Sequence, residues 1–381
     1  MVFDAPLRAG IIGGGFMAEV HSRAVRSAGH TVAGVSTSSR ASAHAAAQRI
    51  GAQQSFDSAL ELITSPDIDV IHVCTPNDLH ADLSLAAIAA GKPVICEKPL
   101  ATTLADAAIL TDAARSAQVP TAVPFAYRYY PTIREIRSRI ASGEAGDLLL
   151  LHGSYLQDWL AEPLSTNWRV DPAKGGASRA FADIGVHWCD LMEFVTGHRI
   201  NRIAANLATS YLSRGESSQS NSVGTEDVAT VLFETDRGAV GSLTVSQISR
   251  GRKNRLWFSF DGSEGSYQFN QENPNELWIG GTDESRTIAS GSAGLRGEDA
   301  RKYAVLPAGH PQGYQDAFNA FVSDAYRAFA GQSIASLPTF DDGHRAAAIT
   351  DAVVAASQTR TWVDVVSAPA PAPALGLPLK K

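Results

Sequence analysis

The chain has 381 residues, 44% of them hydrophobic, and a formal net charge of −7. This length allows two domains with real cores, and the acidic charge argues against a nucleic-acid binder, which normally carries a basic face. No apolar run approaches the roughly 18 residues of a membrane span and the N-terminus lacks a signal-peptide pattern, so we expect a cytoplasmic protein with no membrane partner.

The first third of the chain alternates short apolar runs with amphipathic stretches. The apolar runs predict strands at residues 9–12, 31–35, 70–74, 93–96 and 119–123. The stretches between them predict helices at residues 18–27, 42–50, 57–63, 82–90 and 104–117. This alternation is typical of an α/β protein with a doubly wound parallel sheet, a Rossmann domain over residues 1–125. Ligands bind such sheets beyond the carboxyl ends of the strands.

A glycine-rich turn follows the first strand. The spacing is Gly13-x-Gly15-x-x-Ala18, in which the first glycine permits the turn, the second lets a pyrophosphate approach the backbone, and the small Ala18 allows close packing. Such a turn can also be purely structural. Because it opens a strand–helix–strand pattern, we predict a dinucleotide site at its helix N-terminus. The residues assigned to the cofactor here are Gly13, Gly15, Phe16 and Met17.

The end of the second predicted strand lacks the acid that commonly binds the ribose hydroxyls of NAD. The chain instead has Ser36, Thr37, Ser38, Ser39 and Arg40, and hydroxyls beside a guanidinium suit a 2′-phosphate. These residues could also simply cap the next helix. The predicted cofactor is therefore NAD(P), with NADP favoured over NAD, and the residues assigned are Ser36, Thr37, Ser38 and Arg40.

Two further polar segments follow predicted strands of this sheet. One is Thr75-Pro76-Asn77-Asp78-Leu79-His80, and the other is Glu97-Lys98-Pro99. Most lysines in loops are surface residues, but one at the carboxyl edge of a parallel sheet lies where the ligand binds. Pro99 fixes the local backbone and could form a cis bond. We assign to the cofactor site Thr75, Pro76, Asn77, His80, Glu97 and Lys98.

The second half, residues 126–366, has a different pattern. A helix is predicted at 132–141, and strands at 148–157, 228–233, 239–247, 255–260, 265–269 and 276–279, largely without intervening helices. This predicts a substrate-binding and oligomerisation domain of α+β type with a large, mostly antiparallel open sheet. Helices at 314–330 and 342–359 complete it, and the Pro/Ala-rich tail at 367–381 is expected to be disordered.

Asp183 and His187 stand four residues apart before an apolar helical stretch, so on a helix they share one face. A buried histidine with a carboxylate one turn away suits a general base. A capping aspartate and a core histidine would give the same pattern. A metal site is not expected, because two such ligands have no third candidate nearby. The three cysteines, Cys74, Cys96 and Cys189, are scattered in apolar contexts and predict small buried side chains.

Four segments in this order, GIIGGGFMAEVH, TPNDLH, CEKPL and DIGVH, resemble the Gfo/Idh/MocA oxidoreductases. The resemblance extends from about residue 7 to residue 366. It implies a Rossmann domain followed by a domain whose open sheet mediates homodimers or homotetramers. It also implies that Lys98, Asp183 and His187 form the catalytic set. Many members have Asp after the second strand, where this chain has Ser36.

These observations predict reversible oxidation of a secondary hydroxyl on a cyclic sugar or polyol (a pyranose, an anhydrosugar or an inositol). His187 would accept the proton, Lys98 would hold the oxygen, and Asp183 would orient the substrate or His187. The candidates for substrate contact are Tyr127, Arg128, Tyr155, Gln157, Trp159, Trp168, Arg169 and His310. Two other functions stay open: a nucleotide-binding regulator without chemistry, and a glycosidase assisted by transient oxidation.

Overall fold

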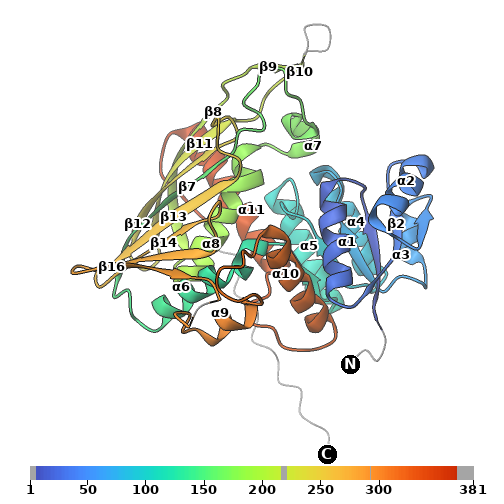
Figure 1. Ribbon diagram of the computed structural model, residues 1–381. Helices are drawn as coiled ribbons and strands as arrows, with labels where there is room; N and C mark the ends of the chain where they lie inside the picture. The colour runs from blue at the N-terminus through green and yellow to red at the C-terminus, as the bar shows by residue number, and fades with distance from the viewer. Residues whose placement is uncertain (1–5, 216–220, 292, 367–381) are drawn as a thin grey trace, which may run out of the picture.

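The computed structural model describes residues 6–215, 221–291 and 293–366, and the predicted disordered tail lies outside these ranges. Its two main sheets stand side by side, with the N-terminal third on one side of the molecule and the large sheet on the other (Figure 1). Among the described residues, no helix has both the length and the apolar character needed to cross a membrane.

The first sheet is parallel and has six strands in the order β3-β2-β1-β4-β5-β6. Its strands are β1 (Arg8–Ile12), β2 (Thr31–Ser36), β3 (Gln54–Phe56), β4 (Val70–Val73), β5 (Val94–Cys96) and β6 (Thr121–Ala122). The connecting helices are α1 (Phe16–Ser27), α2 (Arg40–Ile50), α3 (Ala59–Thr64), α4 (His80–Ala89) and α5 (Leu104–Ala117), with the short turn η1 (Asn77–Leu79) before α4. The predicted Rossmann sheet is confirmed. Strand β3 was not predicted, because it is a three-residue edge strand in which only Phe56 is buried.

The second sheet has nine strands, in the order β16-β15-β14-β13-β7-β12-β11-β8-β17. The strands are β7 (Leu148–Leu156), β8 (Ile200–Ala208), β11 (Val228–Thr235), β12 (Val240–Ser246), β13 (Arg255–Gly262), β14 (Ser266–Asn270), β15 (Glu276–Gly280), β16 (Ser285–Ala289) and β17 (Val363–Asp364). Neighbours pair antiparallel except β7 and β12, which are parallel, so the expected mostly antiparallel sheet is confirmed. Strand β8 was not predicted, because its INRIAANLA sequence is rich in Ala and Asn, which have low β-propensity.

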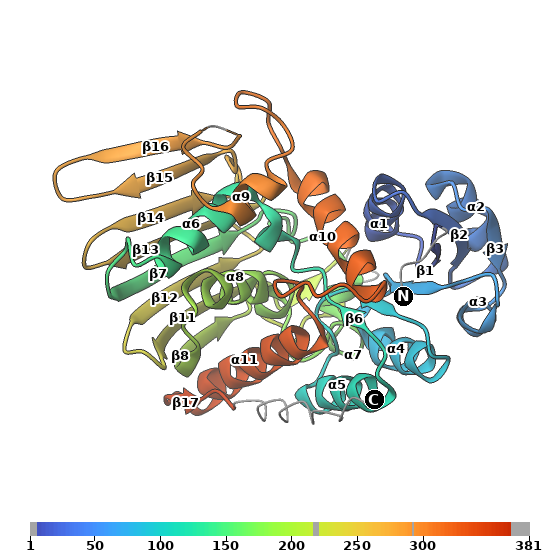
Figure 2. The ribbon, with the colours of Figure 1, turned by 90° about the horizontal axis from the view of Figure 1, so that it is seen from below.

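Helices cover one face of this sheet and leave the other uncovered (Figures 1 and 2). The covering helices are α6 (Pro131–Ala141), α8 (Val186–Thr196) and α11 (Phe340–Thr359). Shorter elements complete the half: η2 (Ala126–Tyr129), η3 (Trp168–Val170), α7 (Pro172–Gly175), the π-helical turn η4 (Phe181–Gly185), the hairpin of β9 (Ser213–Arg214) with β10 (Asn221–Ser222), and α9 (Glu298–Tyr303).

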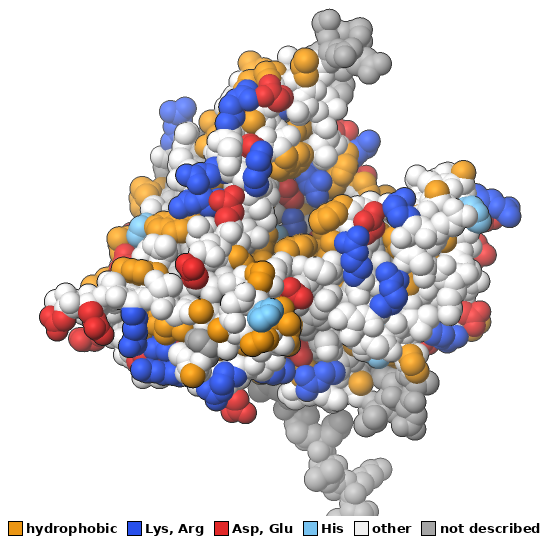
Figure 3. Space-filling view, in the orientation of Figure 1, with side chains coloured by type: hydrophobic (Ala, Val, Ile, Leu, Met, Phe, Trp, Pro, Cys, Tyr) orange, Lys and Arg blue, Asp and Glu red, His pale blue; other side chains and the backbone are white. Residues whose placement is uncertain are grey.

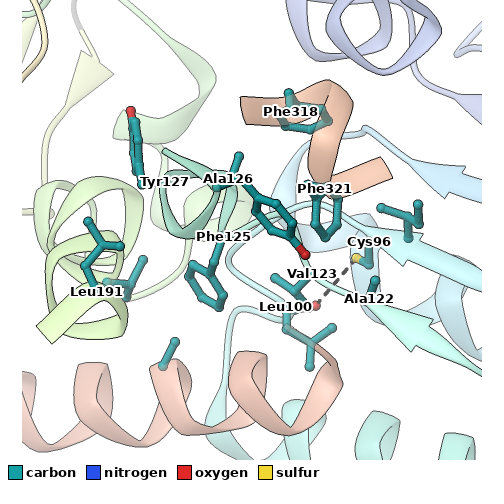
Figure 4. Close-up of a cluster of buried hydrophobic side chains, with 14 of the residues drawn as sticks. Cys96, Leu100, Ala122, Val123, Phe125, Ala126, Tyr127, Leu191, Phe318 and Phe321 are labelled. Atoms are coloured by element: carbon teal, nitrogen blue, oxygen red, sulfur yellow. Dashed lines mark hydrogen bonds between the residues drawn. The ribbon is translucent and has the colours of Figure 1, made fainter. Parts of the chain in front are cut away.

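One hydrophobic core joins the two halves. Helix α10 (Tyr314–Phe329) follows the large sheet in the chain but packs against α1 and η2. Figure 4 shows this junction: the connecting segment with Phe125, Ala126 and Tyr127 lies between Leu191 of α8 on one side and Phe318 and Phe321 of α10 on the other. The carboxyl edge of the parallel sheet is thereby held against η4, which contains Asp183, and the start of α8, which contains His187.

Candidate active site

The turn after β1 needs glycine at one position and leaves open space at another. Gly13 has φ +120°, and a Cβ there would lie 2.3 Å from the carbonyl oxygen of Cys74. A Cβ on Gly15, which precedes α1, would meet no heavy atom within 4 Å. The first N–H groups of α1 have no side-chain cap. Free N–H donors at a positive helix end with open space before them fit the phosphates of a dinucleotide.

Phe16 and Met17 begin α1 at this opening. The Phe16 side chain is largely exposed, and the sulfur of Met17 accepts a hydrogen bond from the Tyr314 hydroxyl at 3.9 Å. Met17 therefore touches α10 as well as the turn.

The residues after β2 divide into a buried one and an exposed group. The structure does not bring Ser36 to the surface, because its hydroxyl is completely buried and has no hydrogen-bond partner among the described residues. Ser39 caps α2 by accepting from the Ser42 N–H at 3.2 Å, as the capping alternative predicts. Thr37 shares a hydrogen bond with the Ser42 hydroxyl at 2.5 Å. Ser38 and Arg40 are exposed, and Arg40 pairs with Asp57 at 3.5 Å.

His80 fastens the two loops that follow β4 and β5. Its ring nitrogens lie 3.0 Å from the carbonyl oxygen of Thr75 and 2.8 Å from that of Pro99, and the ring is fully buried. Burial lowers the pKa of His80. The side chain is therefore a clamp between the loops and does not face an open site. Asn77 in turn donates to the carbonyl oxygen of Gly175 at 3.1 Å, which ties the first loop to α7.

Glu97 ends a chain of buried hydrogen bonds that runs through two histidines. Its Oε1 lies 3.0 Å from Nε2 of His21, the Nδ1 atoms of His21 and His72 are 2.7 Å apart, and Nε2 of His72 lies 2.8 Å from the Tyr326 hydroxyl. One set of neutral tautomers satisfies all three bonds: Tyr326 donates to His72, His72 to His21, and His21 to ionised Glu97. Consistently, burial first and His21 second hold the pKa of His72 well below its ordinary value. The other carboxylate oxygen of Glu97 accepts from the Lys98 N–H at 3.2 Å.

The predicted pair of Lys98 and Asp183 forms across the two halves. The peptide before Pro99 is cis, and Lys98 Nζ donates to both Oδ1 and the carbonyl oxygen of Asp183, each at 2.8 Å. Arg169 Nε lies 3.3 Å from the same Oδ1, and Gln247 donates to Oδ2 at 2.9 Å. Burial opposes the charged carboxylate, but Lys98 and Arg169 hold the pKa of Asp183 well below its ordinary value.

His187 is not a hydrogen-bonded partner of Asp183. The residues between them form the π-helical turn η4 and the start of α8, so the α-helical spacing assumed from sequence does not apply. The His187 ring instead packs edge-on against Tyr127, with ring centroids 5.0 Å apart. Its Nδ1 is buried and finds no hydrogen-bond partner in the described part of the chain. Burial first, and then the charge of Lys98, hold the pKa of His187 well below its ordinary value.

Four of the predicted substrate contacts lie in one polar cluster beside His187. The hydroxyls of Tyr127 and Tyr155 are 2.6 Å apart, and Tyr155 and Gln157 each donate to Oδ1 of Asn254 at 2.7 Å. Trp159 Nε1 donates to Gln157 Oε1 at 2.8 Å. The cluster offers hydroxyl, amide and aromatic groups, which is the chemistry that recognises a polyol.

The other four predicted substrate contacts lie outside this polar cluster. Arg169 stacks on the indole of Trp168, at 4.4 Å from its centroid, and reaches Asp183. The structure does not bring Arg128 into the cluster: its buried guanidinium is paired with Asp190 and Asp342, which raise its pKa against the effect of burial. His310 lies on an exposed loop and makes no side-chain hydrogen bond with the cluster in the described part of the chain.

Sequence reasoning missed Gln247 and Asn254. Gln247 stands at the end of a predicted strand, where a fully buried amide has no local signature, and Asn254 lies in a turn before β13. Only the pairing of β7 with β12 and β13 brings these residues to Asp183 and Tyr155.

A Rossmann sheet with an open helix N-terminus, and a lysine at its edge paired with a second half, form the arrangement of a two-part dinucleotide-binding protein. The match to family models is specific. Residues 7–125 match the oxidoreductase family with NAD-binding Rossmann fold, and residues 133–268 match the GFO/IDH/MocA C-terminal domain. The chain belongs to the Gfo/Idh/MocA oxidoreductase family.

Several members of the family are similar over almost the full length. Levoglucosan dehydrogenase from Pseudarthrobacter phenanthrenivorans is 32% identical over 94% of this chain and 98% of its own. A levoglucosan dehydrogenase structure in complex with NADH and levoglucosan has a TM-score of 0.89 and 32% identity, covering 95% of this chain and all of that one. An inositol dehydrogenase homologue from Azotobacter vinelandii, in complex with NAD⁺, has a TM-score of 0.83 and 25% identity, covering 95% of this chain and 98% of that one.

Proposed function

We propose that this oxidoreductase interconverts a secondary hydroxyl and a ketone on a cyclic sugar or polyol. The observation that carries the proposal is the position of Lys98 and His187 between the carboxyl edge of the NAD-binding sheet and the polar cluster of Tyr127, Tyr155, Gln157 and Asn254. Similarity to a levoglucosan dehydrogenase, a 1,5-anhydro-D-fructose reductase and a D-apiose dehydrogenase supports a sugar substrate.

The geometry divides the work among the residues. When bound, NAD(P) supplies the group that accepts or returns the hydride, and the α1 N-terminus with Gly13 and Gly15 holds its phosphates. The Lys98 ammonium, fixed by Asp183, orients the substrate oxygen and stabilises negative charge on it. His187 takes the hydroxyl proton at Nε2, because its Nδ1 is sealed in the protein. The polar cluster presents the remaining hydroxyls in one orientation.

The cofactor proposal includes a preference for NADP over NAD. Its support is the absence of an acid directly after β2 and the exposed guanidinium of Arg40, which a 2′-phosphate can bind in place of Asp57. Replacing Arg40 by Ala should then weaken binding of NADPH more than that of NADH, as followed by nicotinamide fluorescence. Equal losses for the two cofactors would contradict the preference.

We also propose that the enzyme is cytoplasmic, and that two or four copies associate through the uncovered face of the nine-stranded sheet.

A substrate panel tests the reaction itself. Levoglucosan, inositols, glucosides and free pyranoses are each mixed with the protein and NAD⁺ or NADP⁺, and reduced nicotinamide is followed by absorbance. We expect turnover with at least one cyclic polyol and a ketone product by mass spectrometry. Tight cofactor binding with no turnover on any of them would indicate a regulator, and aglycone release without net reduction would indicate a glycosidase.

A further inference from the structure

Among the described residues, the buried side chain of Gln247 forms a single hydrogen bond, which is to Asp183. The residue follows β12 and is completely buried, and its Nε2 donates to Oδ2 of Asp183 at 2.9 Å. Its backbone is fixed on both sides, since its N–H donates to the carbonyl oxygen of Asp227 at 3.1 Å and its carbonyl accepts from the Leu160 N–H at 3.2 Å. The side chain therefore has little freedom to leave the carboxylate.

The other end of the amide is unsatisfied. Oε1 of Gln247 is buried and has no hydrogen-bond partner among the residues that the structure describes. Turning the amide over would place its oxygen against the ionised carboxylate, so the nitrogen must face Asp183. An unsatisfied buried amide oxygen costs stability, and the Gln247 side chain offsets it with only one bond, to Asp183, the residue that fixes Lys98.

Two hydrogen bonds and one ion pair hold the Asp183 carboxylate. Lys98 and Arg169 meet Oδ1, and Gln247 meets Oδ2. His187 forms no hydrogen bond with it, although the two residues come from adjoining turns.

We propose that Gln247 is a positioning residue that locks Asp183 as a permanent anchor for Lys98, so that proton transfer is left to His187. The kinetic part of this inference rests on the proposed dehydrogenase function. The positioning part concerns the protein alone and can be tested without turnover.

A substitution of Gln247 by Glu makes the hydrogen bond from residue 247 to Asp183 dependent on pH. Two carboxyl groups at this separation ionise together only with difficulty, so the pair keeps one proton to a higher pH than an isolated carboxyl would, and the protonated Glu side chain can still donate to Asp183. At higher pH the proton is lost and the two charges repel. The charged groups beside Asp183 are Lys98 and Arg169, and its other titratable neighbours include His187, Tyr127 and Tyr155. On the strand side, Asp227 is paired with Arg179 and Arg214.

The expected result is a new descending limb in the pH profile. The kcat of Gln247→Glu relative to wild type should be close to one at acidic pH and fall about tenfold to 100-fold as pH rises, because a displacement of about 1 Å costs that much. Gln247→Leu should lose kcat to a similar extent at every pH. A ratio for Gln247→Glu that does not change with pH, or a Leu variant with wild-type kcat, would overturn the proposal.

Gln312 provides the matched control. It is also a buried glutamine, but its amide bonds to the carbonyl oxygen of Tyr303 and the Leu306 N–H, away from Asp183. Gln312→Glu should therefore show no new limb. Thermal melting of each variant across the same pH range separates loss of the lock from loss of the fold.

A chemical readout keeps the inference separate from the substrate question. Without cofactor or substrate, acetic anhydride should label Lys98 several-fold faster in Gln247→Leu than in wild type. The reason is that Asp183, which accepts the hydrogen bond of the Lys98 ammonium, is no longer held in place. Lys92, which donates to the carbonyl oxygen of Ser65 at 2.6 Å, is the internal control in the same peptide map. Equal labelling of Lys98 in the two proteins would overturn the positioning role even if no substrate were found.

Discussion

At the scale of single residues, the carboxylate of Asp183 is fixed by its partners, whereas the proposed base His187 is not held by a hydrogen bond to it. Asp183 accepts hydrogen bonds from Lys98 and Gln247 and forms an ion pair with Arg169. His187 instead has aromatic neighbours and a buried Nδ1 that finds no hydrogen-bond partner among the described residues. The sequence could predict both residues and Lys98 from their motifs. It could not predict that Asp183 bonds Lys98 in preference to His187, because the π-helical turn η4 has no signature in the residues Phe181–Gly185.

The buried position of His187 predicts how activity depends on pH. A base must be unprotonated, and the lowered pKa keeps His187 neutral at and somewhat below the ordinary value of 6.5. We therefore expect kcat for hydroxyl oxidation to hold its plateau as pH falls through 6.5 and to decline only at more acidic pH. His187→Gln should lower kcat by about 100-fold or more and remove that decline. A half-maximal rate at or above the ordinary pKa would show that another group is the base.

At the scale of elements, the β1–α1 turn was the most predictable part of the chain. Its glycines have backbone requirements that can be recognised in sequence, and the structure shows Gly13 in the left-handed region. The polar residues after β2 were less predictable. Hydroxyl side chains suit both a helix cap and a phosphate, and burial of Ser36 depends on packing that the local sequence does not encode.

The two glycines of this turn should respond differently to alanine. Gly13→Ala forces a Cβ to within 2.3 Å of the Cys74 carbonyl, so we expect a loss of stability of about 3 kcal/mol or more in urea unfolding. Gly15→Ala has room for its Cβ, so stability should change by less than about 1 kcal/mol. The same Cβ occupies the space proposed for the pyrophosphate, and the Kd for NADH should rise at least about tenfold. Unchanged NADH binding in Gly15→Ala would place the phosphates elsewhere.

At the scale of the whole molecule, one large surface has no covering layer. The uncovered face of the nine-stranded sheet includes Leu150, Leu232 and Val240, which are 40%, 55% and 52% exposed. Alternation along β11 and β12 places Leu232 and Val240 on the side opposite the buried residues Phe233 and Leu243. The sequence could indicate a sheet with one open face, but not β8 or β17, which complete its edge.

We expect a second copy to cover this face. Analytical ultracentrifugation of wild type should give a dimer or tetramer, and Leu232→Glu should shift it toward monomer, because a carboxylate would be buried without a partner. Ile109→Glu, at an exposed apolar residue on α5, is the matched control and should leave the mass unchanged. A monomeric wild type would contradict the prediction.

We expect Lys98 to act on the substrate oxygen next to the bound nicotinamide. The most direct measurement compares wild type with Lys98→Met in a single turnover, using enzyme saturated with its preferred oxidised cofactor and a cyclic polyol found in the panel. We predict that the variant binds NADH as wild type does but forms reduced nicotinamide at least about 1000-fold more slowly, since the charge that stabilises the oxyanion is gone. A variant that reduces the cofactor at the wild-type rate would contradict the account.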